Sequence, residues 1–114
     1  MCESMHKVWV QVKLYYTPEF DLRGNNSGEE AEFWLMHMLP FAPVSGLNLA
    51  DLGECLIRKH HVSNVWYNAR HQEFMCYTEF HRCNDADSFQ RHVDALKAMG
   101  EKHPTWVREQ KPFE

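Results

Sequence analysis

The sequence has no long hydrophobic run, and no stretch approaches the roughly 18 to 20 apolar residues that a membrane span needs. Residues 1–13 also lack the apolar core and the small-residue cleavage site of a signal peptide. We therefore expect a soluble, unexported protein of the cytoplasm that has no membrane partner.

Positive charge is not in excess either. Twelve Lys and Arg residues against sixteen Asp and Glu residues give a net charge of −4, so the composition offers no general attraction to a nucleic-acid backbone. We expect no nucleic-acid partner. The chain has eight histidines, which is a high number for its length. Protonating half of them near pH 6 would cancel the net charge.

Paired-cysteine motifs, internal repeats and low-complexity tracts are missing as well. The four cysteines show no C-x-x-C spacing, and we interpret them as reduced thiols rather than as a disulfide framework. A chain of 114 residues suits one domain with one hydrophobic core. We therefore treat residues 1–114 as a single domain.

Three β-type segments stand out. Residues 6–16 alternate between aliphatic and mixed side chains, which predicts a strand. Residues 62–70 and 73–82 are rich in Val, Trp, Tyr and Phe around a turn at 71–72, which predicts a hairpin. Residues 105–111 fit one edge strand, because Pro112 limits strand pairing there.

Three segments carry helix signals. Ser27 and Glu30 form a capping box ahead of helically spaced apolar residues that end before Pro40. Asn48 is a cap for a second helix that extends to about residue 61. Residues 84–87 begin the last helix, and its apolar stripe consists of Phe89, Val93, Leu96 and Met99.

The predicted order is β, α in two pieces, β, β, α, β. This order is the ferredoxin-like βαββαβ plan, an α+β fold in which both helices cover one face of an antiparallel sheet. Because alternate residues of a strand point to opposite faces of the sheet, the face away from the helices carries a mixed set of aromatic and polar side chains. Its members are Trp9, Gln11, Lys13, Tyr15, Trp66, Asn68, Arg70, Met75, Tyr77, Glu79 and His81.

That second face has two interpretations. A monomer would expose its aromatic side chains, so we expect a second subunit to cover it and form a homodimer. Its polar members are then either the rim of a wet dimer interface or the lining of a small-molecule cavity with aromatic walls. A salt bridge of Glu79 with Lys13 or Arg70 belongs to the first interpretation.

The C-terminal part of the chain resembles a known family. Residues 74–80 (FMCYTEF), an acidic cap at Asp85 or Asp87, and the Phe89-x-x-His92 pair on the following helix are similar to the antibiotic biosynthesis monooxygenase family. The resemblance covers about forty residues, from Phe74 to Phe113. It implies a dimeric α+β barrel with a cavity in each subunit for a flat aromatic substrate, and it transfers directly to Glu79 and His92.

Several members of that family oxidise phenols or quinols with O₂ without a metal or flavin, so the resemblance implies no cofactor. Such chemistry needs a base that ionises the phenol and donors that hold the anion. We assign His81 as the base, with Glu79 beside it and His92 as a further catalytic candidate. The candidate substrate-binding residues, which stack on the ring or hold the anion, are Trp9, Trp66, Asn68, Arg70 and Tyr77.

Two other function classes remain open. The protein is alternatively a non-catalytic ligand-binding module or a structural dimerising subunit. A metal triad of His71, His81 and Glu79 would suit iron or zinc. Because His71 has the opposite strand parity and lies at the turn, we assign no metal site.

Overall fold

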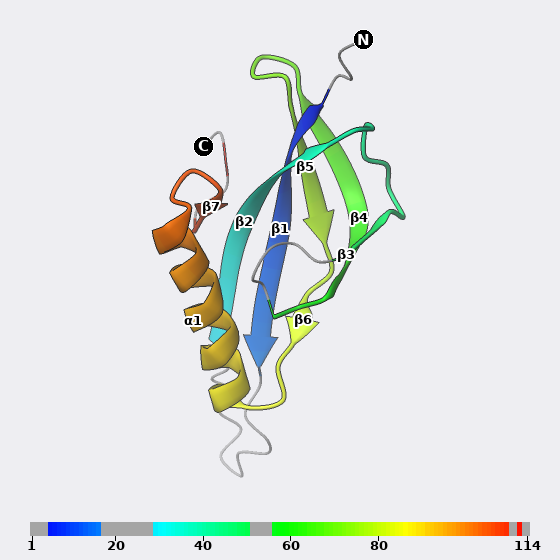
Figure 1. Ribbon diagram of the computed structural model, residues 1–114. Coiled ribbons are helices and arrows are strands. Elements are labelled where there is room, and N and C mark those ends of the chain that lie inside the picture. The colour runs from blue at the N-terminus through cyan, green and yellow to red at the C-terminus, as the bar shows by residue number, and fades with distance from the viewer. Residues whose placement is uncertain (1–4, 17–28, 51–55, 110–111, 113–114) are drawn as a thin grey trace.

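The computed structural model describes residues 5–16, 29–50, 56–109 and 112. Figure 1 shows a twisted sheet with one helix along one of its faces. This helix, the only one among the described residues, is neither long nor apolar enough to cross a membrane. The elements in chain order are β1 (His6–Tyr16), β2 (Glu29–Leu39), β3 (Asn48–Ala50), β4 (Lys59–Asn68), β5 (Glu73–Thr78), β6 (His81–Arg82), α1 (Ala86–Lys102) and β7 (Val107–Arg108).

The sheet is mixed, and β1 lies near its centre. The strand order is β3-β4-β5-β1-β2-β7, and β6 also pairs with β1. Strand β1 runs antiparallel to β2 but parallel to β5 and β6. The remaining pairs, β3 with β4, β4 with β5, and β2 with β7, are antiparallel.

The helix predicted to begin at Ser27 is wrong, because residues 29–39 form the strand β2. This strand pairs with β1 over its whole length, from Tyr16↔Glu29 to His6↔Leu39. The segment Phe33–Met36 is apolar at every position, so it fits a helical stripe and a strand equally well. Residues 29–39 form a strand because they pair with all eleven residues of β1. Ser27 itself lies outside the described residues.

The second predicted helix, over 48–61, is also wrong in its described parts. Asn48–Ala50 form β3 and pair antiparallel with Lys59–His61 at the start of β4. Asn48 Oδ1 accepts a hydrogen bond from His61 Nδ1 at 2.9 Å instead of capping a helix. Residues 51–55, which also belong to the predicted helix, lie outside the described residues.

Other predicted elements are confirmed. Strand β1 has the predicted bounds, and β4 and β5 form the antiparallel hairpin around a turn at 69–72. Helix α1 begins after Asp85 and buries its predicted stripe of Phe89, Val93, Leu96 and Met99. Strand β7 pairs at the edge of the sheet, although it is only two residues long.

The ferredoxin-like α+β fold, and the dimeric α+β barrel that depends on it, are therefore wrong. A ferredoxin-like chain has two helices over a four-stranded antiparallel sheet. Within the described ranges, one helix covers a seven-stranded mixed sheet, because the segment expected to form the first helix forms β2, the antiparallel neighbour of β1.

Alternate residues of β1 define the two faces of the sheet. Val8, Val10, Val12 and Leu14 join the main core with the buried stripe of α1, so we call this the helix face. On the opposite face, Trp9, Trp34 and Met75 form a second, smaller cluster, against which Met36 and Tyr77 pack. The expectation that a monomer exposes Trp9 is wrong, because only 4% of this residue is exposed.

Candidate metal centre

The site depends on a change of register beside β1. Val10 aligns with Cys76 of β5, an offset of 66 positions, whereas Leu14 aligns with His81 of β6, an offset of 67. One extra residue therefore lies between Thr78 and His81, where the strand is interrupted. Because successive strand residues point to opposite faces, this residue moves His81 to the face of Leu14, which is the helix face.

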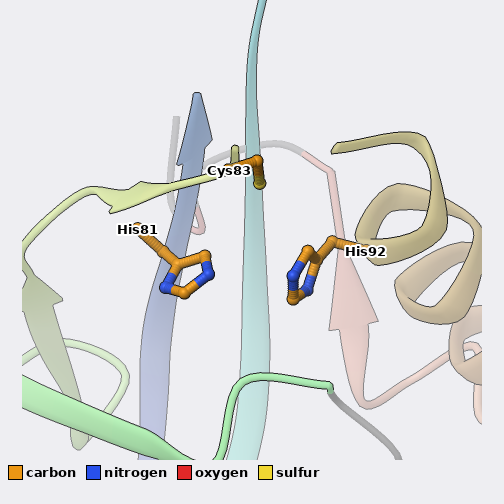
Figure 2. Close-up of side chains that lie close together, drawn as sticks. All are labelled: His81, Cys83 and His92. Atoms are coloured by element: carbon orange, nitrogen blue, oxygen red, sulfur yellow. The ribbon is translucent and has the colours of Figure 1, made fainter. Parts of the chain in front are cut away.

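On the helix face His81 meets two other potential metal ligands. One donor atom from each of His81, Cys83 and His92 lies within 4.8 Å of the other two. Figure 2 shows the His81 ring from β6 facing the His92 ring from α1, with the Cys83 side chain beside them. The two ring centroids are 5.0 Å apart and the rings are inclined at 63°.

The backbone that carries these residues is well anchored. The Cys83 amide donates to the Tyr15 carbonyl at 2.7 Å, which extends the pairing of β6 with β1. Two residues later, the Asp85 carboxylate accepts from the Ser88 amide at 2.7 Å and caps α1. The strand end and the first turns of the helix are thereby fixed to each other, and His92 follows in the second turn.

Burial sets the protonation of the two imidazoles. Desolvation lowers the pKa of His81, and desolvation, the neighbouring His81 and Arg91 lower the pKa of His92. Both rings are therefore neutral near pH 7 and can present a nitrogen lone pair. Burial, followed by the charge of Asp85, raises the pKa of Cys83, so its thiol keeps its proton until a cation displaces it.

One buried atom of the cluster lacks a hydrogen-bond partner. Nδ1 of His92 is inaccessible to solvent and makes no hydrogen bond with any described residue. An unpaired buried polar atom costs about 1 to 3 kcal/mol, so native structures seldom retain one without a reason. A metal ion is a partner that would satisfy it.

Comparisons with family models, curated proteins and solved structures found no match.

The three predicted catalytic residues are only partly brought together. The rings of His81 and His92 face each other, whereas Glu79 is exposed in the break between β5 and β6. Glu79 and His81 were predicted to point the same way from one continuous strand. That parity is wrong, because the extra residue between Thr78 and His81 turns His81 to the helix face.

The predicted substrate-binding residues do not form one pocket with His81. Trp9 is buried and donates from Nε1 to Glu73 Oε2 at 3.1 Å. Trp66 is 65% exposed, and Tyr77 packs edge-on against Trp34 with ring centroids 5.3 Å apart. Asn68 accepts from the His71 amide at 3.0 Å, and Arg70 is exposed in the same turn. The homodimer and the oxygenase chemistry stay predictions.

Cys83 was not predicted as a site residue, only as a reduced thiol. The signal was the spacing His81-x-Cys83 with His92 nine residues after the cysteine, across a recognisable helix cap. The alternative metal triad combined His81 with His71 and Glu79, and both of these are exposed in the structure. Recognising the cluster required the face of His81, which depends on the register against β1.

Proposed function

We propose that this protein binds a transition-metal ion, with Zn²⁺ as the first candidate, through His81, Cys83 and His92. The observation that carries the proposal is the convergence of three N and S donors within 4.8 Å of one another. Two imidazoles and a thiolate are a ligand set that Zn²⁺ and copper favour. No carboxylate belongs to the cluster among the described residues, and Mg²⁺ and Ca²⁺ prefer oxygen ligands.

The distances require a small adjustment of the side chains. Zn–N bonds of about 2.0 Å and a Zn–S bond of about 2.3 Å place donors about 3.5 Å apart in a tetrahedral site. The donors lie within 4.8 Å, so closing on an ion needs movements of roughly 1 Å per pair. Rotation of the two partly exposed histidines supplies such movements without a change in the buried Cys83 backbone.

Cobalt titration tests the proposal directly. The full chain is stripped with a chelator and titrated with Co²⁺, whose bond to a thiolate gives a charge-transfer absorption in the near ultraviolet. Displacement of the cobalt by Zn²⁺, in competition with a chromophoric chelator, then gives the Zn²⁺ dissociation constant. We expect saturation at one ion per chain, displacement by Zn²⁺ or Cu⁺, and no displacement by Mg²⁺.

Variants identify the ligands. Cys83→Ser should abolish the charge-transfer absorption, and His92→Gln should weaken Zn²⁺ binding at least about a hundredfold, since removing even an outer-shell partner of a metal ligand costs 10- to 100-fold. His103→Gln is the matched control, because His103 follows the same helix but stacks on Trp106. An unchanged absorption in Cys83→Ser would place the metal on another cysteine and reject this site. No absorption in the wild type would leave the two histidines as packing residues.

A further inference from the structure

The outer edge of β2 is only partly covered. Strand β7 pairs with β2 at Trp34 and Leu35, and no described strand pairs with residues 29–33 on this side. Pro112, which follows β7 in the chain, lies in a turn and has no N–H to donate to this edge. Residues 29–33 therefore form an open sheet edge, on which another strand can pair.

The backbone of β2 shows which groups remain unpaired at this edge. The Met36 amide points outward, because it donates to the Trp106 carbonyl at 2.7 Å. In an antiparallel strand the N–H and C=O of one residue point the same way, and this direction alternates from residue to residue. The backbone groups of Glu32 and Glu30 therefore also point outward, and they pair with no described strand. Each of these residues offers one donor and one acceptor to an added strand.

A groove lies between this edge and the helix. It contains a pocket of about 470 Å³, lined by residues 29–33, by part of α1 and by Glu109 of the segment after β7. Figure 1 shows α1 on this side of the sheet. Phe33, Phe89 and Val93 are the buried apolar members of the lining. Because alternate side chains of a strand point to opposite faces, an added strand would direct every second side chain into this pocket.

Carboxylates surround the groove. Glu29, Glu30 and Glu109 line the pocket and are exposed, and none of them makes an ion pair with a described residue. Glu32 adds a fourth carboxylate, and Lys97 is the only cation among the described residues of the lining. A second copy of this chain would bring these carboxylates against each other, and like charges destabilise strand pairing. The charge of the groove therefore favours a basic partner.

We infer that the open edge of β2 binds an extended, basic segment of another protein by strand addition. The segment lies in line with β7 and antiparallel to β2, and its backbone pairs with Glu30 and Glu32. Its basic side chains lie on the face of these two residues, and the apolar side chains between them enter the pocket at Phe33 and Phe89. This interaction is a function beyond metal binding, and no metal ligand takes part in it.

A short labelled peptide tests the interaction. The full chain is titrated with a fluorescein-labelled peptide of alternating lysine and valine, and fluorescence anisotropy gives the dissociation constant. One control peptide alternates glutamate and valine. The other keeps the lysines and valines but is N-methylated at the lysine amides, which the proposed register pairs with Glu30 and Glu32. We expect saturable binding of the first peptide and none of either control.

Amide hydrogen exchange locates the bound peptide. Because the Glu30 and Glu32 amides point outward and are unpaired, they should exchange rapidly in the free protein and more slowly with the peptide bound. The Ala31 and Phe33 amides point toward β1 and should change less. Binding that leaves the Glu30 and Glu32 amides unprotected would overturn the proposal, because the peptide would then lie elsewhere.

Variants of Glu30 separate the backbone from the charge. Glu30→Gln keeps the outward N–H and should weaken peptide binding by up to about fivefold, as for loss of one exposed ion pair. Glu30→Pro also removes the N–H and should weaken binding about tenfold more. Proline is tolerated on a sheet edge where the N–H faces solvent, and circular dichroism checks that the fold is retained. Glu101→Gln removes a charge from α1 outside the groove and should have no effect.

Several results would reject strand addition. Equal affinities of Glu30→Pro and Glu30→Gln would show that the outward N–H takes no part. Equal binding of the N-methylated peptide would show the same from the side of the partner, and no binding of the lysine peptide would exclude a basic segment. Light scattering that shows a wild-type dimer which Glu30→Pro dissociates would assign the edge to a second copy of this chain instead.

Discussion

Phe33 and Met38 distinguish the strand β2 from the helix that the sequence pattern predicts. In the structure Phe33 is 2% exposed and belongs to the main core, whereas Met38 is 48% exposed. On a helix with a buried stripe of Ala31, Trp34, Leu35 and Met38, the burial of these two residues would be reversed. We therefore expect Phe33→Ala to destabilise the protein far more than Met38→Ala.

The magnitude follows from burial. Truncation of a buried Phe to Ala costs about 3 to 5 kcal/mol, because it removes apolar contacts and leaves a cavity. Met38 loses only part of its contacts, so its truncation should cost less than about 1 kcal/mol. A chain of 114 residues has an unfolding entropy near 0.24 kcal/mol per kelvin, so each kcal/mol shifts Tm by about 4 °C. Phe33→Ala should thus lower Tm by about 12 °C or more.

Urea denaturation followed by circular dichroism measures both free energies of unfolding. Since total stability is about 5 to 15 kcal/mol for most proteins, Phe33→Ala could leave too little folded protein to analyse. Phe33→Leu, which removes less volume, then provides an intermediate value. A cost for Met38→Ala equal to or above that for Phe33→Ala would refute the assignment of residues 29–39 to a strand that buries Phe33.

Three further predictions concern the site and its support. Zn²⁺ at a free concentration of one hundred times its dissociation constant should stabilise the fold by about 2.7 kcal/mol, or about 11 °C in a thermal melt, and Cys83→Ser should remove this shift. Burial lowers the pKa of His37 below 6.5, so the unfolded chain binds a proton at this residue more readily than the folded chain does. The free energy of unfolding should therefore fall as the pH drops below 6.5. Urea titrations of His37→Gln across this pH range should show a shallower fall than those of the wild type. Asp85→Ala should cost about 1 kcal/mol in urea denaturation through loss of the helix cap, whereas Asp87→Ala, which leaves the cap in place, should cost less; equal costs would contradict the capping role.

The sequence pattern predicts an element where its apolar residues recur with a single spacing, either that of a strand or that of a helix. Residues 6–16 alternate cleanly, and the stripe on α1 follows a recognised cap, so both were predicted from the sequence. Segment 29–39 was not, because Phe33–Met36 is apolar on every side and its acidic start resembles a helix N-terminus. Its state is fixed by β1, a partner whose identity the local pattern does not contain.

The candidate site shows the same limit at the scale of one residue. His81 and His92 were chosen as functional residues, but His81 was placed on the face of Tyr77. The strand parity of residues 73–82 is correct up to Thr78 and fails beyond it, because one extra residue shifts the pairing with β1. Such an insertion is defined only relative to the partner strand, so alternation within the segment itself cannot reveal it.

The parallel pairing of β1 with β5 also governs how the chain reaches its native state. Lys7 aligns with Glu73, so β1 pairs with a strand that lies 66 positions further along the chain. The hairpin of β1 and β2 can form early, yet it leaves one side of β1 open until residues 73–82 are available. Closing such a long loop before its contacts form slows folding. During synthesis, the unpaired side of β1 is therefore the surface that needs protection from other chains.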